Sequence, residues 1–223
     1  FEDEDIIEEE DWEEDVEEED QEMDDDDDDD EDETMTVQVH RWERSNAARA
    51  LWLRNPDEIT PEEYTGFYQT LVKNMDTPMA YSHFRVEGST NFRSVIFVPN
   101  TAPFNIFESI GERLNYIKLY VRRVFVTDDW QGLMPKWLNF VHGVVDADDV
   151  DINISREVLQ QNEVVQKMMK KVVKKAIDMM HEIMRRPDPT EYEQFWKNYG
   201  KNLKVGVVED DDNRWRLARL MRM

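Results

Sequence analysis

A block of negative charge at the N-terminal end limits which residues of this chain can build a packed core. Residues 1–34 contain 26 Asp and Glu and no Lys or Arg. Like charges at this density repel one another, and the few apolar residues between them bury too little surface to offset the loss of chain entropy. We therefore expect residues 1–34 to form an acidic disordered linker, and the folded part to begin near residue 35.

Two functions fit such a linker. The simpler one is a solvated spacer. The other is weak and diffuse Ca²⁺ binding, because carboxylates are hard oxygen ligands and suit this cation. The segment has no EF-hand pattern with its glycine, so the second interpretation predicts uptake only in the millimolar range.

The rest of the chain is nearly neutral. The formal charge of the whole sequence is −25, and residues 35–223 hold 26 acidic residues against all 27 Lys and Arg. We expect no nucleic-acid partner. No apolar run reaches the roughly 18 residues of a membrane span, and the absence of cysteine excludes disulfides. Because the sequence lacks an initiator methionine and ends in "RLARLMRM", we expect a segment of a longer protein.

The first half of the neutral region shows mixed signals. Thr60, Pro61 and Glu63 predict a capped helix over 59–71. The stretch before it, up to Asn55-Pro56, is expected to be extended. Two β-rich runs flank "EGST" and predict a hairpin. Residues 105–113 and 134–140 suggest short helices. Residues 116–128 predict a central strand, and residues 140–147 another strand.

The second half is helical. A long helix is expected from Ser155 to about residue 184, where "RRPDP" stops it. A second helix should end at Gly200, and a third begins near residue 213. Apolar residues recur along the long helix with three- and four-residue steps, which favours core packing over a binding groove: Val158, Val165, Met169, Val172, Ala176, Met180 and Ile183.

These elements define an α/β (α+β) fold class, in which a mixed sheet layered with helices is followed by a small helical unit. We expect three regions. Residues 1–34 are the linker, 35–155 form the α/β layer, and 156–223 form the long helix and the helical unit.

Residues that could hold a metal ion are few and poorly spaced. His40, His83, His142 and His181 show no metal-ligand spacing, and we interpret them as structural. The acidic group Asp146, Asp148, Asp149 and Asp151 lacks the glycine and glutamate of a Ca²⁺ loop, which favours solvated loop acids. The sequence therefore predicts no metal site outside the linker.

The stretch "NISREVLQQN" (153–162) has an unusual charge. Arg156 follows the predicted N-cap Ser155, where the positive end of the helix dipole disfavours a cation. The free N–H groups of a helix start bind anions, and an arginine there can grip a phosphate with its fork of donors. Gln160 lies on the same helix face. The alternative is an ion pair of Arg156 with Asp148 or Asp149, and the residues alone leave both open.

"NIS" (153–155) is also an N-glycosylation sequon. A glycan on Asn153 would block the proposed phosphate site. We expect the folded protein to be largely unmodified at this position.

Several long motifs resemble the heat shock protein 90 family of ATP-dependent chaperones. They are "NPDEITPEEYTGFY", "FRSVIFVPNTAPFNIFE", "YIKLYVRRVFVTDD", "PKWLNFVHGVVDADD" and "NISREVLQQN". The resemblance covers residues 41–223 and is to the middle segment of that family, with residues 1–34 similar to its charged linker. "FWKNYGKNLKVGVVEDDDNR" is closer to the endoplasmic-reticulum branch, so we expect the lumen of that compartment, with the cytoplasm as second choice.

The resemblance implies specific roles. Arg156 would contact the terminal phosphate of ATP held by the N-terminal domain of the same protein, with Gln160 beside it and Asn153 and Ser155 supporting the loop. Trp52 and Phe104 match client-binding aromatics, with ordinary core burial as the alternative.

The resemblance also implies how the protein assembles and acts. The chain alone should be monomeric and should hydrolyse no ATP. The whole protein should be a homodimeric ATP hydrolase with clients and co-chaperones. The competing functions are a client-binding module without a catalytic role, and an acidic Ca²⁺-binding protein.

Overall fold

The computed structural model describes residues 49–88, 90–102, 106, 116–128, 134–150 and 163–221. They belong to one compact unit, Ser45–Met223. A five-stranded mixed sheet forms its centre, in the order β1-β2-β5-β3-β4. The strands are β1 (Pro78–Val86), β2 (Phe92–Pro99), β3 (Tyr116–Val121), β4 (Val124–Thr127) and β5 (His142–Ala147). Strands β3 and β5 are parallel, and the other neighbours are antiparallel. The predicted α/β class is confirmed.

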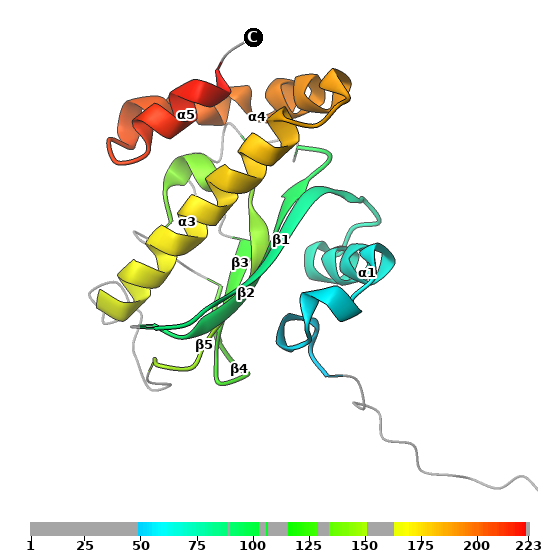
Figure 1. Ribbon diagram of the computed structural model, residues 1–223, viewed down its shortest axis with the longest axis vertical. Helices are drawn as coiled ribbons and strands as arrows, with labels where there is room; N and C mark the ends of the chain where they lie inside the picture. Colours follow the sequence, from blue (N-terminus) through cyan, green and yellow to red (C-terminus); the bar gives the residue numbers. More distant parts are fainter. Residues whose placement is uncertain are drawn as a thin grey trace, which may run out of the picture. The chain divides into compact units, whose positions relative to one another are not determined.

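Helices cover both faces of this sheet (Figure 1). Helix α3 (Glu163–Met184) crosses one face, and α1 (Pro61–Val72) lies on the other. Helices α4 (Pro189–Glu209) and α5 (Arg214–Leu220) gather at one end of the unit. The main hydrophobic core joins the α3 face of the sheet to α4 and α5. A smaller core of Ile59, Tyr64, Tyr68, Val95 and Phe97 lies under α1.

The α1 helix begins as the sequence predicts. Glu63 N–H donates to Thr60 Oγ1 over 3.3 Å, and Thr60 N–H donates back to Glu63 Oε2 over 3.0 Å. This reciprocal pair is a complete capping box, and Pro61 occupies the first turn. Tyr64 and Tyr68, four residues apart on one face of the helix, are buried against the sheet.

The long helix packs its methionine-rich stripe into the core, as predicted. Val165, Met169, Val172, Ala176, Met180 and Ile183 are all buried. Val158 lies outside the described residues. The helix ends at Met184, and α4 starts at Pro189 after the cap Asp188, in agreement with the stop at "RRPDP".

From its proline we expected the stretch before α1 to be extended, and this prediction is wrong. The stretch forms two short 3₁₀ turns, η1 (Leu51–Leu53) and η2 (Pro56–Glu58). Leu51 and Trp52 pack against the small core, and this contact folds the stretch back onto the sheet. Long-range packing thus overrides the local preference for extended backbone.

Residues 116–128 form a hairpin and not the single central strand of our prediction. The turn lies at Arg122 and Arg123, whose φ angles of 47° and 69° are both left-handed. Two such residues are typical of a type I′ turn, which normally carries Asn or Gly. Because arginines occupy these positions, the sequence contains no turn signal. Strand β5 is the central one.

Helix α4 continues through Gly200, where we expected it to end. The residues after Gly200 keep the helical period, and Leu203 and Gly206 are buried. Gly206 leaves room for the indole ring of Trp137, since a Cβ atom there would lie 2.8 Å from it. Trp137 belongs to η4 (Lys136–Leu138), which fulfils the prediction of a short helix at 134–140.

Three other predictions fall outside the described residues. They concern the short helix at 105–113, apart from the buried Ile106, and the domain boundaries at residues 34 and 155. These boundaries stay predictions.

Candidate functional site

The side chain of Trp52 lies over the α1 face of the sheet, close to the end of β5. Its ring centroid is 5.0 Å from that of Tyr120 on β3 and 5.9 Å from that of Phe67 on α1. The indole Nε1–H donates to Asp146 Oδ2 over 2.9 Å. Trp52 remains only partly buried, so it combines a fixed position with an accessible aromatic surface.

Asp146 is the hub of this region. It belongs to β5, is only 2% exposed, and accepts a second hydrogen bond at Oδ1 from the backbone N–H of Arg123, over 3.2 Å. A buried carboxylate needs such donors because the loss of water is costly. The interpretation of Asp146 as a solvated loop acid is therefore wrong. Strand pairing buries it, and the sequence pattern carries no sign of that pairing.

The β3–β4 turn attaches to the end of β5 through backbone groups. Arg122 N–H donates to the carbonyl of Ala147 over 3.1 Å, and Arg122 Nε donates to the carbonyl of Asp148 over 3.3 Å. These bonds, with the bond from Arg123 to Asp146, offset the unfavourable left-handed backbone of both arginines.

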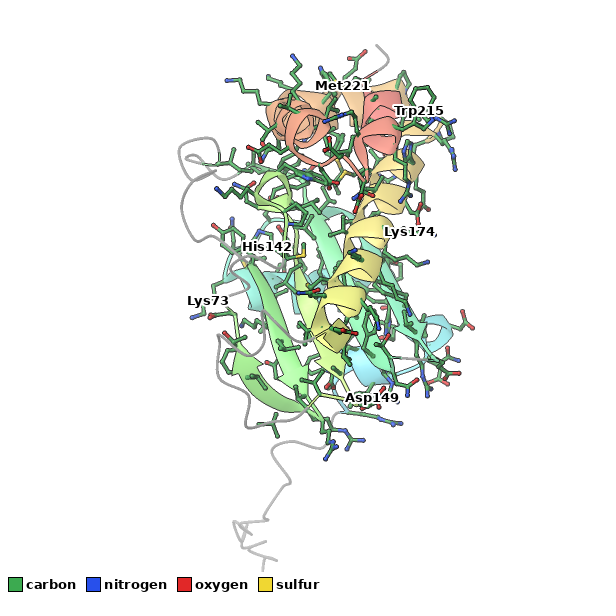
Figure 2. The ribbon with its side chains drawn as sticks, turned by 90° about the vertical axis from the view of Figure 1, so that its left-hand side faces the viewer. Lys73, His142, Asp149, Lys174, Trp215 and Met221 are labelled. Carbon is green, nitrogen blue, oxygen red and sulfur yellow. The ribbon has the colours of Figure 1, made fainter. Side chains whose placement is uncertain are left out.

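The β1–β2 turn attaches to the same strand end. Asn91 N–H donates to Asp149 Oδ2 over 2.7 Å, and Asp148 N–H donates to the carbonyl of Asn91 over 3.0 Å. The Asn91 side chain accepts from Gly88 N–H, where φ is +130°. Asp149 is exposed and marks the end of the sheet farthest from α5 (Figure 2).

Together these bonds fix the chain on both sides of residues 151–162. Three separate segments hold the end of β5 up to the buried Val150. On the other side, α3 is packed on the sheet from Val165 onward, and Lys171 Nζ donates to Thr90 Oγ1 over 3.4 Å. The described residues on both sides, Val150 and Val165, are thus buried in fixed positions.

The predicted phosphate-contact residues belong to that segment. Asn153, Ser155, Arg156 and Gln160 lie outside the described residues, as does Phe104. Their roles stay predictions. Trp52 is the one predicted site residue that the structure describes, and it is both partly buried and partly accessible.

His83 links Trp52 to α1. Its Nε2 lies 3.4 Å from the carbonyl oxygen of Trp52, which can only accept, so Nε2 carries the proton. Its Nδ1 then accepts from the Tyr64 hydroxyl over 2.8 Å. Burial lowers the pKa of His83 below its usual value, which favours this neutral form. His83 is thus engaged in structural hydrogen bonds.

His142, at the other end of β5, lies between aromatic rings. It stacks on Tyr116 with centroids 4.2 Å apart, and Tyr68 meets its edge. Within the described ranges, no three His, Asp or Glu side chains converge as a metal site would require. Nor does any helix in these ranges combine the length and apolar character needed to cross a bilayer.

Replacing Asp146 with asparagine should destabilise the protein by about 1–3 kcal/mol, because the amide NH₂ would face one of the two N–H donors and leave it unpaired. The matched control is Asp149→Asn. Among the described residues Asp149 accepts one hydrogen bond, from Asn91 N–H, which an amide oxygen can still accept. Urea unfolding of both variants measures the difference. Equal stability of the two variants would contradict the role of Asp146 as the hub.

The fold and this arrangement define a class: a mixed α/β layer with a partly exposed aromatic cluster beside the end of its central strand. Comparison with known proteins identifies the family. The family model described as "Hsp90 protein" matches residues 1–223. The chain belongs to the Hsp90 family.

Relatives span two named groups. The chain is 41% identical to an endoplasmin homolog of Caenorhabditis elegans over 81% of this chain and 23% of that protein. It is 43% identical to an endoplasmin homolog of Dictyostelium discoideum over 85% of this chain and 25% of that protein. It is 45% identical to heat shock protein 83 of Leishmania donovani over 81% of this chain and 39% of that protein. The chain thus spans well under half of these relatives.

One solved structure supports the position of the chain within the family. The middle domain of a Plasmodium falciparum heat shock protein superposes with a TM-score of 0.68 and 31% identity, covering 77% of this chain and 65% of that one. The described unit therefore has the fold of an Hsp90 middle domain.

Proposed function

We propose that this chain is the middle segment of an ATP-dependent molecular chaperone. In this role it docks on the N-terminal ATP-binding domain of the same protein, supplies Arg156 to the terminal phosphate of ATP, and offers a surface for clients and co-chaperones. The observation that carries the proposal is the fixed position of the described residues on both sides of residues 151–162, which results from the bonds around Asp146 and from the packing of α3. Family membership supports the same role.

The chemistry of Arg156 would be electrostatic. During phosphoryl transfer, negative charge spreads over the oxygens of the transferred group, and a guanidinium placed there stabilises it. ATP itself would be held by the N-terminal domain. Trp52 would belong to the surface for clients, because its ring stays partly exposed although its indole N–H is fixed on Asp146.

A second candidate function is a client-binding module without a catalytic role, whose acidic linker binds Ca²⁺ weakly. The accessible Trp52 cluster favours the client part of this alternative. The endoplasmin homologs favour the endoplasmic-reticulum lumen, and the similar identity to heat shock protein 83 keeps the cytoplasm as second choice.

Mixing the chain with the separately prepared N-terminal domain tests the catalytic proposal. Phosphate release should rise above the sum of the two parts, and neither part should turn over ATP at that rate alone. A chain lacking residues 1–34 should stimulate equally, provided that the linker only spaces the domains. Unchanged turnover, in a mixture where NMR shifts show that the two domains bind, would favour the non-catalytic module.

A further inference from the structure

A cavity beside Trp52 is rich in arginine. It has a volume of about 710 Å³ and lies between the η1–η2 turns and the β1–β2 hairpin. Arg49, Arg54, Arg85 and Arg93 line it, and among the described residues of its wall Glu58 is the single acidic one. We call this space the arginine cavity. No role proposed above uses its arginines.

Strand register places two of these arginines directly opposite each other. Arg85 of β1 pairs with Arg93 of β2, so both side chains leave the same face of the sheet. It is the α1 face, because their neighbours His83 and Val95 contact Tyr64 and the small core. Like charges directly opposite on neighbouring strands destabilise a sheet. An anion bound between the two guanidinium groups would offset this repulsion.

The nearby carboxylates compensate this pair only in part. Arg85 has an ion pair with Glu87 at 2.9 Å, but the two side chains are 61% and 68% exposed, so the pair is weak and easily exchanged. On the neighbouring strand β5, Asp146 lies directly opposite Arg93, but its oxygens already accept hydrogen bonds from Trp52 and Arg123. Within the described part of the chain, Arg93 forms no ion pair of its own.

The remaining arginines have different positions. Arg54 is held by Glu63 at 2.5 Å and by the carbonyl of Glu58 at 3.1 Å, so it forms a fixed wall. Arg49 is exposed at the rim. The groups free to bind an anion are therefore Arg93, Arg85 after release from Glu87, and Arg49.

We propose that the arginine cavity binds a phosphorylated side chain on an extended segment of a partner polypeptide, with the phosphate between Arg85 and Arg93. A phosphate offers three acceptor oxygens, which match two guanidinium forks better than a carboxylate does. The cavity is much larger than a phosphate, and Trp52, Leu53 and Pro56 add apolar wall for the flanking residues. Recognition of phosphorylated motifs by arginine clusters is a recurrent binding mode.

The assignment of this phosphate to a partner polypeptide rests on the proposed partner-binding role of Trp52. It does not depend on any role of Arg156. Binding can be measured on the chain itself. Three synthetic peptides of one sequence, with phosphoserine, glutamate or serine at the central position between apolar residues, serve as probes, and inorganic phosphate is the fourth. Titration calorimetry at low salt gives the affinities.

The expected order of affinity is phosphoserine, then glutamate, then serine, with inorganic phosphate far weaker than the phosphopeptide. Raising the salt concentration should weaken the binding of the phosphoserine peptide more than the binding of the serine peptide. Arg93→Gln and Arg85→Gln should each lower the affinity for the phosphoserine peptide by about tenfold or more. Arg93→Lys keeps the positive charge but loses the forked guanidinium donors. Its affinity should lie between those of the Gln variants and that of the wild type.

Arg219→Gln is the matched control. It removes the same charge from α5, where Arg219 lies over the ring of Trp215, and should leave the affinity unchanged. Melting temperatures of Arg93→Gln and Arg85→Gln should be equal to or above that of the wild type, because each substitution relieves the like-charge pair. This result excludes misfolding as the cause of lost binding.

Several results would overturn the inference. Equal affinity for the phosphoserine and serine peptides would exclude an anion site, and equal affinity for inorganic phosphate would exclude a peptide ligand. An unaffected Arg93→Gln variant would place the site elsewhere. These peptide-binding results are independent of the ATP turnover of the mixed domains. The failure of this inference and the failure of the catalytic proposal are therefore distinguishable.

Discussion

Replacing Arg156 with alanine in the whole protein should lower ATP turnover by about a thousandfold or more, which is the scale of an arginine that acts directly on the transferred phosphoryl group. The affinity for ATP should change much less, because the N-terminal domain would hold the nucleotide. Single-turnover measurements at saturating ATP separate the chemical step from binding.

The fold should survive this substitution. At the predicted first turn of a helix the dipole disfavours a cation, so the loss of Arg156 should leave the melting temperature unchanged or slightly higher. Arg186→Ala is a suitable control, since Arg186 lies in the α3–α4 connection and pairs with Glu191 at 2.7 Å. Near-normal turnover of Arg156→Ala would refute the catalytic role, and a similar loss in Arg186→Ala would point to a general defect.

Acidification from pH 7 to pH 4 should cost the folded unit about 3 kcal/mol through His142 alone. His142 is 4% exposed, and burial lowers its pKa to about 4 from an ordinary value of 6.5. As the pH falls through this window, the unfolded chain binds the proton first. The contribution of His142 is therefore complete above pH 6.5 and is lost progressively toward pH 4.

Urea unfolding of the wild type and of His142→Phe between pH 4 and pH 7.5 measures this contribution. Phenylalanine keeps a ring between Tyr116 and Tyr68 but does not titrate, so the free energy of unfolding of the variant should fall less on acidification, by about 3 kcal/mol. Tyr116→Phe is the control, because it keeps the stacked ring and leaves His142 in place. Parallel pH profiles for the wild type and His142→Phe would show that His142 is not the acid-sensitive group.

Local signals in the sequence carried much of the fold. The capping box of Thr60 and Glu63 and the apolar period of α3 each predicted a helix correctly, because both depend on residues within a few positions of one another. The same locality explains the errors. Gly200 is a good helix end in isolation, but later residues extend the period of α4 and bury Leu203.

The candidate site was less accessible to sequence reasoning. The motif around Arg156 could be found because its chemistry and its resemblance lie in one continuous stretch. The hub at Asp146 could not, because it depends on Trp52, 94 positions earlier, and on Arg123, 23 positions earlier. Left-handed arginines at the β3–β4 turn also lack any composition signal, since contacts with β5 stabilise them.

The sequence by itself determined the concentration of negative charge in residues 1–34, the capped start of α1 and the buried stripe of α3, and the class of the fold. All three follow from composition and short-range periodicity. Only the tertiary structure decided that Asp146 is buried under Trp52 and that Arg85 faces Arg93 across two strands. The physical reason is strand register: it brings distant residues together, and a shift by one residue would turn each of these side chains to the other face of the sheet.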